Sequence, residues 1–356
     1  MTEATIRLAD CYDGLLMDLD GVVYIGNDAV PGAAEALDTA QACGLPACFV
    51  TNNASRPPGA VAAHLQTLGI AATPSTVSTS AGAAAAIAQG LVEAGASVHA
   101  VGGEGVAEAL RAVGLTPLRT PQQHPRANEP PRPSAVVIGF GADVGWRDLA
   151  WASYWISGGA HFIATNFDRT FPQPWGAAPG NGVFVSAVHE ATGVRPTVAG
   201  KPEATLFHWA AQQRQWRRPL VVGDRLDTDI AGAVNSGYDG LVVLTGVTDI
   251  HDLLRADVRM RPTMIASDLA VLAGSLLPIA AVGVSDDRWQ ASGWSATVNR
   301  ATNGWRVDLE HADPAGDQAP LQGHQGLAAT LACAAVWSRF PHGVPDGSVE
   351  IHGWPD

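Results

Sequence analysis

The feature that most constrains the fold is a regular alternation of short apolar runs with longer alanine-rich segments. Residues 14–18 form the first apolar run and residues 46–50 form the second. Between them, residues 31–43 have a proline at the start and a glycine directly after the end, which is typical of a helix. Strands and helices that alternate in this way predict an α/β fold with a parallel sheet.

A second α/β alternation interrupts the first and predicts an inserted domain. Its expected strands are residues 97–101, 134–138 and 160–164. The first alternation resumes at residues 197–199 and continues to an apolar strand at residues 220–223. We therefore expect a discontinuous core domain of residues 1–80 and 196–275 and an inserted α/β domain of residues 81–195.

The C-terminal part, residues 276–356, is rich in tryptophan and follows a different pattern. Strand-like runs at residues 295–299 and 305–310 flank Asn303-Gly304, a pair that is typical of a β-hairpin. A helix is expected at residues 326–338. We predict a small α+β extension.

Charge and cysteine usage exclude several classes of partner and site. The formal net charge of −13 disfavours nucleic acid and anionic membranes, because both attract basic surfaces. The N-terminus lacks the pattern of a secretory signal, and no apolar stretch is long enough for membrane insertion. The four cysteines show no C-x-x-C spacing, so we expect a reduced, cytoplasmic protein. Assembly as a homo-oligomer stays open.

Two carboxylates lie at the end of the first predicted strand. Asp18 and Asp20 lie two residues apart, and Gly21 then allows the backbone to turn. Ligands in open α/β sheets bind beyond the carboxyl ends of the strands, so both side chains are candidates for a site there. Such a pair suits a nucleophile and a general acid/base in phosphate chemistry. The alternative is that Asp20-Gly21 only forms a turn.

Polar groups that bind phosphate follow two further elements. Thr51, Asn52 and Asn53 end the second predicted strand with a hydroxyl and two amides, which can donate hydrogen bonds to phosphate oxygens. Their alternative role is helix capping or turn formation. Lys201 is the only lysine in the chain, and the other residues in the Lys+Arg count are arginines. Its position therefore indicates a need for a compact ammonium group beside a phosphoryl group. The alternative is a surface lysine that has survived by chance.

A third apolar strand, at residues 220–223, leads into an acidic cluster. Asp224, Asp227 and Asp229 follow within seven residues of the strand's end. Clustered carboxylates that are ionised near neutral pH favour a hard cation, and Mg²⁺ accepts carboxylates, waters and phosphate oxygens together. Asp227 has a helix N-cap as its alternative role.

These four motifs, in this order, resemble those of the haloacid dehalogenase superfamily over roughly residues 10–270. The resemblance implies a Rossmann-like core. It implies that Asp18 is the nucleophile and a metal ligand, and that Asp20 is the general acid/base and contributes its backbone carbonyl to the metal. It also implies that Thr51 and Lys201 hold the phosphoryl group. Asp224 would complete the direct ligands, and Asp229 would support metal-bound water.

The inserted domain resembles the C2-type α/β cap of the p-nitrophenylphosphatase-like subfamily. The segment on which this resemblance rests runs from Ala164 to Pro172, and residues 179–182 also belong to it. In that subfamily the equivalent segment faces the active site, so Phe171 is the candidate residue for contact with the leaving group of the substrate. For Asn166 and Asp168 we expect a role in fixing the loop through hydrogen bonds to the backbone.

Together these features predict a Mg²⁺-dependent phosphatase that acts on a small phosphate ester through an aspartyl phosphate. Resemblance to arginine-rich, actinobacterial members with a C-terminal extension points first to glycerol 3-phosphate, a compound of glycerophospholipid metabolism. Phosphoglycolate and pyridoxal phosphate are the alternative substrates, and phosphoryl transfer to another alcohol is the alternative reaction. The complete set of charged groups disfavours the alternative that the chain is a binding protein without catalytic activity.

One further segment resembles a different family. Gly323-His324-Gln325-Gly326 precedes a predicted helix and is similar to part of the acyl-coenzyme A loop of acetyltransferases. The extension is too short for a complete acetyltransferase domain. We expect a packing or oligomerisation module that resembles a partial acetyltransferase fragment, and a second activity is the alternative.

Overall fold

The computed structural model describes residues 5–121, 132–173, 175–285, 287–302, 304–312, 322–344 and 348–355. The chain divides into two compact units. The first unit contains Met1–Phe49, Leu68–Ala71 and Ala211–Asp356, and the second contains Val50–Thr67 and Ala72–Ala210. The three-part division expected from the sequence, with a separate extension, stays a prediction.

A six-stranded sheet forms the core of the α/β fold, as predicted. Its strands, in spatial order, are β16 (Met264–Ala266), β15 (Asp239–Val243), β14 (Pro219–Gly223), β2 (Gly14–Met17), β5 (Ala47–Thr51) and β6 (Val77–Thr79). The pairs from β16 to β5 are parallel. Strands β2 and β14 are buried over their whole length, which explains their continuous apolar sequence.

Short elements and helices connect these strands. They are β1 (Ile6–Arg7), α1 (Leu8–Cys11), β3 (Tyr24–Ile25), β4 (Asp28–Ala29), α2 (Ala33–Ala42), α3 (Pro58–Thr67), α8 (Ala204–Gln213), α9 (Ala231–Ser236) and α10 (Ile250–Arg255). Helix α2 ends where Gly44 adopts a positive φ of 83°, a conformation that glycine tolerates and that the sequence pattern anticipated.

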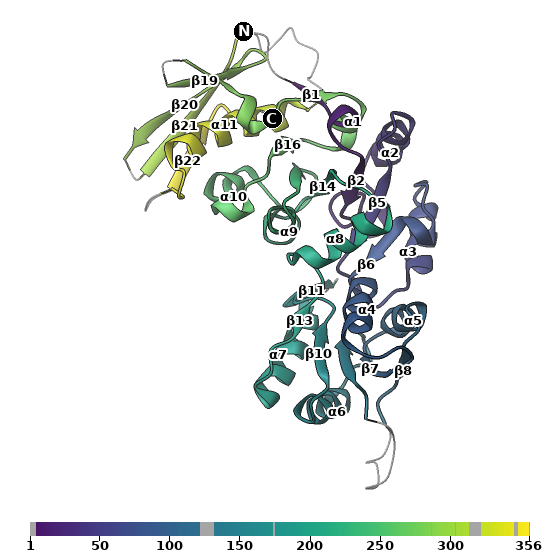
Figure 1. The fold of residues 1–356 in the computed structure, drawn as a ribbon. Coiled ribbons are helices and arrows are strands. Elements are labelled where there is room, and N and C mark those ends of the chain that lie inside the picture. Colours follow the sequence, from purple (N-terminus) through teal and green to yellow (C-terminus); the bar gives the residue numbers. More distant parts are fainter. Residues whose placement is uncertain are drawn as a thin grey trace. The chain divides into compact units, whose positions relative to one another are not determined.

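The second unit has its own parallel sheet, in the order β13-β10-β9-β7-β8. These strands are β13 (Thr197–Val198), β10 (His161–Ala164), β9 (Ala135–Ile138), β7 (Ser97–Val101) and β8 (Thr116–Leu118). Helix α4 (Ser80–Leu91) packs beside α5 (Glu104–Ala112), and α6 (Trp146–Ser157) packs beside α7 (Asn181–Thr192) (Figure 1). A hairpin of β11 (Thr170–Gln173) and β12 (Gly176–Pro179) follows β10.

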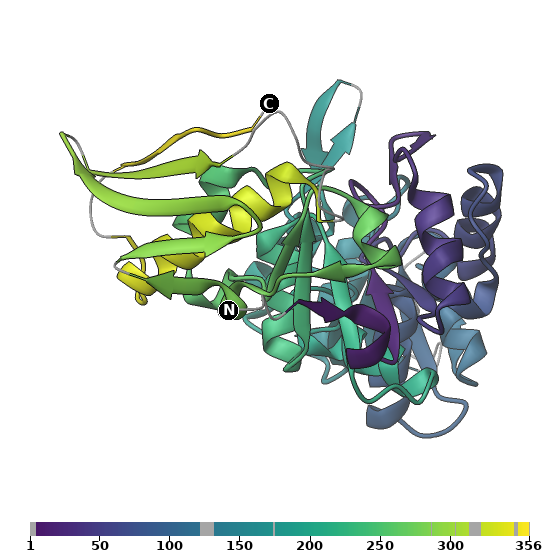
Figure 2. The same ribbon diagram turned by 90° about the horizontal axis from the view of Figure 1, so that it is seen from above.

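The C-terminal extension is α+β, as predicted. Strands β18 (Gly283–Ser285), β19 (Arg288–Ala291), β20 (Trp294–Ala301), β21 (Gly304–His311) and β22 (Ser348–His352) form one sheet in that order. The expected hairpin is confirmed in β20 and β21, whereas Asn303 of its turn lies outside the described residues. Helix α11 (His324–Arg339) lies against the sheet in Figure 2, and it begins two residues earlier than predicted.

Helix α11 and Gln322, which precedes it, join the extension to the core of the first unit. Gln322 is buried and donates hydrogen bonds to the carbonyl oxygen of Ile265 in β16 and to the hydroxyl of Thr330 in α11, both at 2.6 Å. Its own side-chain oxygen accepts from the Leu277 backbone N–H at 3.1 Å. The extension and the core strands therefore share one hydrophobic core.

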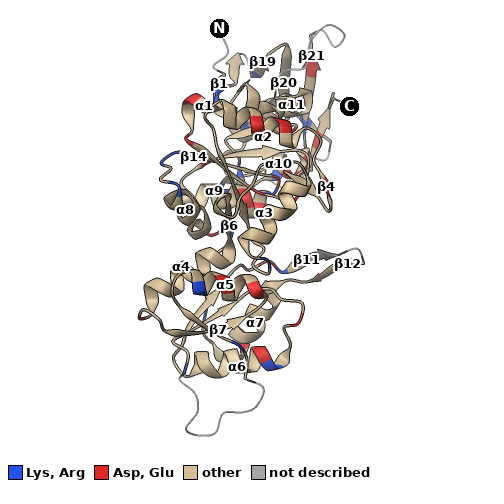
Figure 3. Ribbon diagram, turned by 90° about the vertical axis from the view of Figure 1, so that its right-hand side faces the viewer, with Lys and Arg blue, Asp and Glu red and all other residues tan. Residues whose placement is uncertain are grey.

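Among the described residues, no helix combines the length and the apolar character that a bilayer span requires. Acidic and basic residues are scattered over the elements of both units (Figure 3).

Candidate active site

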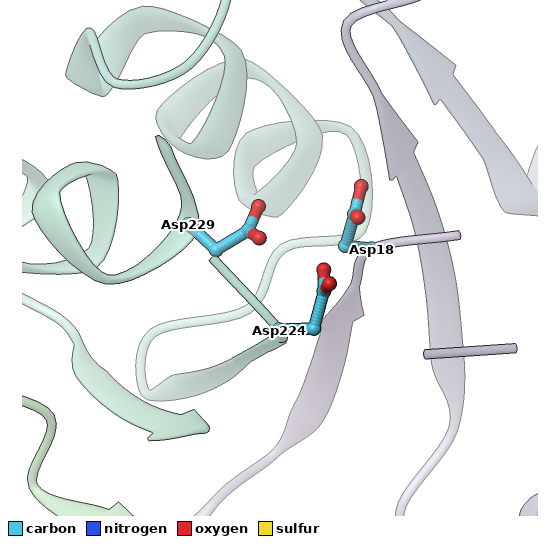
Figure 4. Close-up of side chains that lie close together, drawn as sticks. All are labelled: Asp18, Asp224 and Asp229. Atoms are coloured by element: carbon cyan, nitrogen blue, oxygen red, sulfur yellow. The ribbon is translucent and has the colours of Figure 1, made fainter. Parts of the chain in front are cut away.

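Three aspartates converge in the first unit. Asp18 directly follows β2 and Asp224 directly follows β14, and these two strands are neighbours. Asp229 lies in the single turn of π-helix at Leu226–Ile230. Their side chains lie close together in Figure 4, and one carboxylate oxygen from each lies within 4.8 Å of the others. The structure thus brings together three of the four predicted metal-ligating residues.

Glycines allow the backbone to pack closely around Asp224. A Cβ atom at Gly246 would lie 2.0 Å from Asp224 Oδ2, and one at Gly21 would lie 2.4 Å from the same oxygen. The backbone N–H of Val247 donates to this oxygen at 2.7 Å. Sequence reasoning missed Gly246 and Val247, whose only signal is a glycine soon after an apolar strand. These contacts fix the direction of the Asp224 carboxylate.

Asp229 is held in a similar way from its own turn. Its Oδ2 accepts a hydrogen bond from the backbone N–H of Arg225 at 3.2 Å. Gly223 allows this turn to fold back, since a Cβ atom there would lie 2.3 Å from the Cβ atom of Asp229. A backbone donor and a glycine therefore position each of the two buried carboxylates.

The donor set fits a divalent cation. The side chains of Asp224 and Asp229 are each 1% exposed, and Asp18 is partly buried beside them. Three like charges in a buried site are costly unless a positive charge neutralises them. Oxygen donors alone, with no sulfur or imidazole in the group, match a hard cation such as Mg²⁺.

Asp20 and Asp227 lie outside this group of three. Asp20 is exposed, and the hydroxyl of Tyr24 lies 3.5 Å from its Oδ2. Asp227 forms a two-point ion pair with the guanidinium group of Arg225, at 2.9 Å and 3.1 Å. The N-cap alternative for Asp227 is wrong, because Arg225 occupies the N-cap position of this turn. Asp227 instead anchors the Arg225 side chain.

The predicted phosphate-binding groups lie in the second unit. Thr51 ends β5, and its hydroxyl oxygen accepts the backbone N–H of Asn53 at 3.1 Å. Asn53 Oδ1 accepts two hydrogen bonds from Ser55, at 2.7 Å and 2.9 Å. Within the described residues, neither the Thr51 hydroxyl proton nor the Asn53 amide group has an acceptor. Both remain available as donors.

Lys201 is 4% exposed, and its Nζ donates to the carbonyl oxygen of Val50 at 3.3 Å. A buried ammonium group needs polar partners, and a strand-end carbonyl supplies one. The side chain of Asn52 is bound to protein groups rather than open: it contacts the main chain of Lys201 and the carboxylate of Asp168.

The loop expected to face the leaving group lies next to the β11–β12 hairpin. The expectation for Asn166 is confirmed, because its Oδ1 accepts the backbone N–H of Asp168 at 3.1 Å. Phe171 lies in β11 opposite Ala178, and its side chain lies outside the described part of the chain.

Comparisons with known proteins agree with these features. A family model for haloacid dehalogenase-like hydrolase matches residues 15–116, and one for HAD-hydrolase-like proteins matches residues 198–272. The chain is 42% identical over 333 residues to D-glycerol 3-phosphate phosphatase of Mycobacterium tuberculosis, covering 93% of this chain and 87% of that protein.

Solved structures extend the similarity to the fold. The glycerol phosphate phosphatase of M. tuberculosis crystallised with magnesium superposes with a TM-score of 0.80 and 38% identity, covering 97% of this chain and 95% of that chain. It was also crystallised with calcium. A thermostable NPPase from Geobacillus stearothermophilus superposes with a TM-score of 0.64 and 32% identity, covering 72% of this chain and 96% of that chain. The chain therefore belongs to the haloacid dehalogenase-like hydrolase family and is a phosphatase.

Proposed function

We propose that this chain hydrolyses glycerol 3-phosphate with the help of Mg²⁺ and through a phosphorylated Asp18. The observation that carries the proposal is the convergence of Asp18 with the buried Asp224 and Asp229. A nucleophilic carboxylate beside two further carboxylates is suited to attack on phosphorus only with a cation present, which is what this donor set fits.

The first step forms a covalent intermediate. A carboxylate oxygen of Asp18 attacks phosphorus, and the bond between phosphorus and the ester oxygen breaks. Asp20, which is exposed, gives its proton to the departing alkoxide. In the second step Asp20 takes a proton from a water molecule that attacks phosphorus, and inorganic phosphate leaves with restoration of the Asp18 carboxylate.

Hydrogen-bond donors must hold the phosphoryl oxygens during both steps. We assign this role to Thr51, Asn53 and Lys201, because the first two have donors available and the third is a buried ammonium group. Asn52 belongs to the same group of residues and is considered below.

Asp18, Asp224 and the Asp20 backbone carbonyl are the proposed metal ligands, with Asp229 holding a metal-bound water. Bound Mg²⁺ would offset the charge of the carboxylates and polarise the phosphoryl group.

The proposed substrate rests on similarity. The M. tuberculosis relative named D-glycerol 3-phosphate phosphatase matches over 93% of this chain, which includes most of the C-terminal extension. Phosphoglycolate and pyridoxal phosphate are the next substrates to test. Phe171 is our candidate contact for the leaving group, and the cytoplasm is the proposed location.

The test is release of inorganic phosphate from a panel of these three esters, with Mg²⁺ and then with chelator. Wild-type protein should release phosphate only with Mg²⁺ and should prefer glycerol 3-phosphate. Asp18→Asn should lose at least about 10³-fold in kcat, because the nucleophile is gone. Asp10→Asn, which changes an exposed aspartate of α1, is the matched control.

Two results would contradict the proposal. Full turnover in Asp18→Asn would remove the nucleophile assignment. Phosphorus NMR would detect phosphorylation of an added alcohol. If that product formed in preference to inorganic phosphate, the reaction would be phosphoryl transfer and not hydrolysis.

A further inference from the structure

Asn52 links three segments that are far apart in the sequence. It lies at the end of β5, and it contacts Lys201, which is 149 positions away, and Asp168, which is 116 positions away. All three residues belong to the second unit.

The amide of Asn52 matches both polar groups of the Lys201 backbone. Its Oδ1 accepts the Lys201 N–H at 2.8 Å, and its Nδ2 donates to the Lys201 carbonyl oxygen at 3.0 Å. Two hydrogen bonds to the same residue fix the peptide units on either side of it. The position from which the buried lysine side chain starts is therefore set by one amide group.

Close packing at Gly200 supports this arrangement. A Cβ atom at Gly200 would lie 2.5 Å from Asn52 Oδ1 and 2.6 Å from the carbonyl oxygen of Thr165. Only glycine permits the main chain before Lys201 to approach the amide so closely.

The other end of the amide contacts the loop that follows β10. Asn52 Nδ2 lies 3.2 Å from both carboxylate oxygens of Asp168. The main-chain oxygen of Asn52 accepts hydrogen bonds from Asn166 Nδ2 and from the Ser80 hydroxyl, both at 2.7 Å. The loop expected to face the leaving group is thus tied to the same residue that fixes Lys201.

We infer that Asn52 is a positioning residue: it sets the place of the Lys201 ammonium group and couples that place to the loop at residues 166–168. The inference rests on the proposed function, in which Lys201 binds the phosphoryl group. An aspartate at position 52 could not replace the amide, because its carboxylate would face the Asp168 carboxylate and the Lys201 carbonyl oxygen without a proton to donate.

The test is a double-mutant cycle between positions 52 and 201. A misplaced catalytic group costs up to about 10²-fold, so Asn52→Leu should lower kcat by about 10-fold to 10²-fold with a smaller change in KM. In the Lys201→Met background, Asn52→Leu should cause no further loss, because the group through which it acts is gone. The affinity for inorganic phosphate, measured by calorimetry with Mg²⁺, should follow the same pattern.

A charge-swapped pair tests the link to the loop. Asn52→Asp alone should lose turnover, and Asn52→Asp combined with Asp168→Asn should regain part of it, since the donor and the acceptor have exchanged places. Asn299→Leu is the matched control, because it removes an amide contact of 2.7 Å with Asp308 in the C-terminal extension and should leave turnover unchanged.

Separate outcomes test the inference and the function beneath it. If losses from Asn52→Leu and Lys201→Met multiply, or if the swapped pair recovers nothing while its melting temperature is that of wild type, the positioning role is refuted. If Lys201→Met alone keeps full turnover, Lys201 does not bind the phosphoryl group, and the positioning role of Asn52 is refuted as well.

Discussion

Replacement of Asp224 by asparagine should have opposite effects on stability with and without Mg²⁺. The variant keeps the shape of the side chain, and its carbonyl oxygen can still accept the Val247 N–H that now lies 2.7 Å from Oδ2. What it removes is one of three like charges. In the absence of a cation this removal should stabilise the folded protein, whereas with Mg²⁺ it should remove a ligand.

The size of the effect follows from the separation of the charges. Carboxylate oxygens 4.8 Å apart, the largest separation in this group, repel by about 3.5 kcal/mol per pair at an effective dielectric constant of about 20. Asp224 takes part in two such pairs, so the direct repulsion that the variant removes is about 7 kcal/mol. Other polar contacts of these carboxylates offset part of this repulsion, so a net gain of about 1–3 kcal/mol is expected.

Thermal unfolding in chelator and in saturating Mg²⁺ measures this effect. Wild-type protein should gain several degrees on addition of Mg²⁺, because the ion binds the folded state alone. Asp224→Asn should melt above wild type in chelator and should gain little from Mg²⁺. A variant that melts well below wild type in chelator would refute the reasoning, since the carboxylate would then stabilise the fold without a cation.

Four further results are expected. Calcium should inhibit at fixed Mg²⁺, because it is larger and accepts looser geometry, and equal rates with either ion alone would contradict this. Burial lowers the pKa of His99 from 6.5 to about 4. Between pH 6.5 and about 4 the unfolded state therefore binds more protons than the folded state, so the free energy of unfolding should fall by up to about 3 kcal/mol as the pH drops through this range. In urea unfolding, His99→Gln should show a smaller fall over the same range. Gly246→Ala should weaken activation by Mg²⁺ about 10-fold or more, since its Cβ atom would lie 2.0 Å from Asp224 Oδ2, whereas Gly90→Ala, with open space around it, should not. Gln322→Ala should cost about 2–4 kcal/mol in urea unfolding, because the buried partners at 2.6 Å in β16 and α11 lose their donor.

Local sequence patterns were enough to predict the main strands and the two acidic motifs. The strand expected at residues 14–18 is β2, which ends one residue earlier at Met17, so Asp18 directly follows it. Strand-end carboxylates are visible in a sequence because the apolar run and the acidic residue are adjacent.

Contacts between distant segments could not be predicted in this way. The Val247 N–H reaches Asp224 across 23 positions, and Asn52 reaches Lys201 across 149. No periodicity connects such residues, and the folded chain alone decides their pairing. Gln322 in the C-terminal extension likewise reaches β16 across 57 positions.

The most direct test of the central claim is to trap the phosphorylated enzyme during turnover. Protein mixed with glycerol 3-phosphate and Mg²⁺ is quenched and treated with borohydride, which reduces an acyl phosphate to an alcohol, and its peptides are mapped by mass spectrometry. Residue 18 should be converted to homoserine, and only when both substrate and Mg²⁺ are present. An unmodified residue 18 in protein that is turning over at full rate would contradict this prediction.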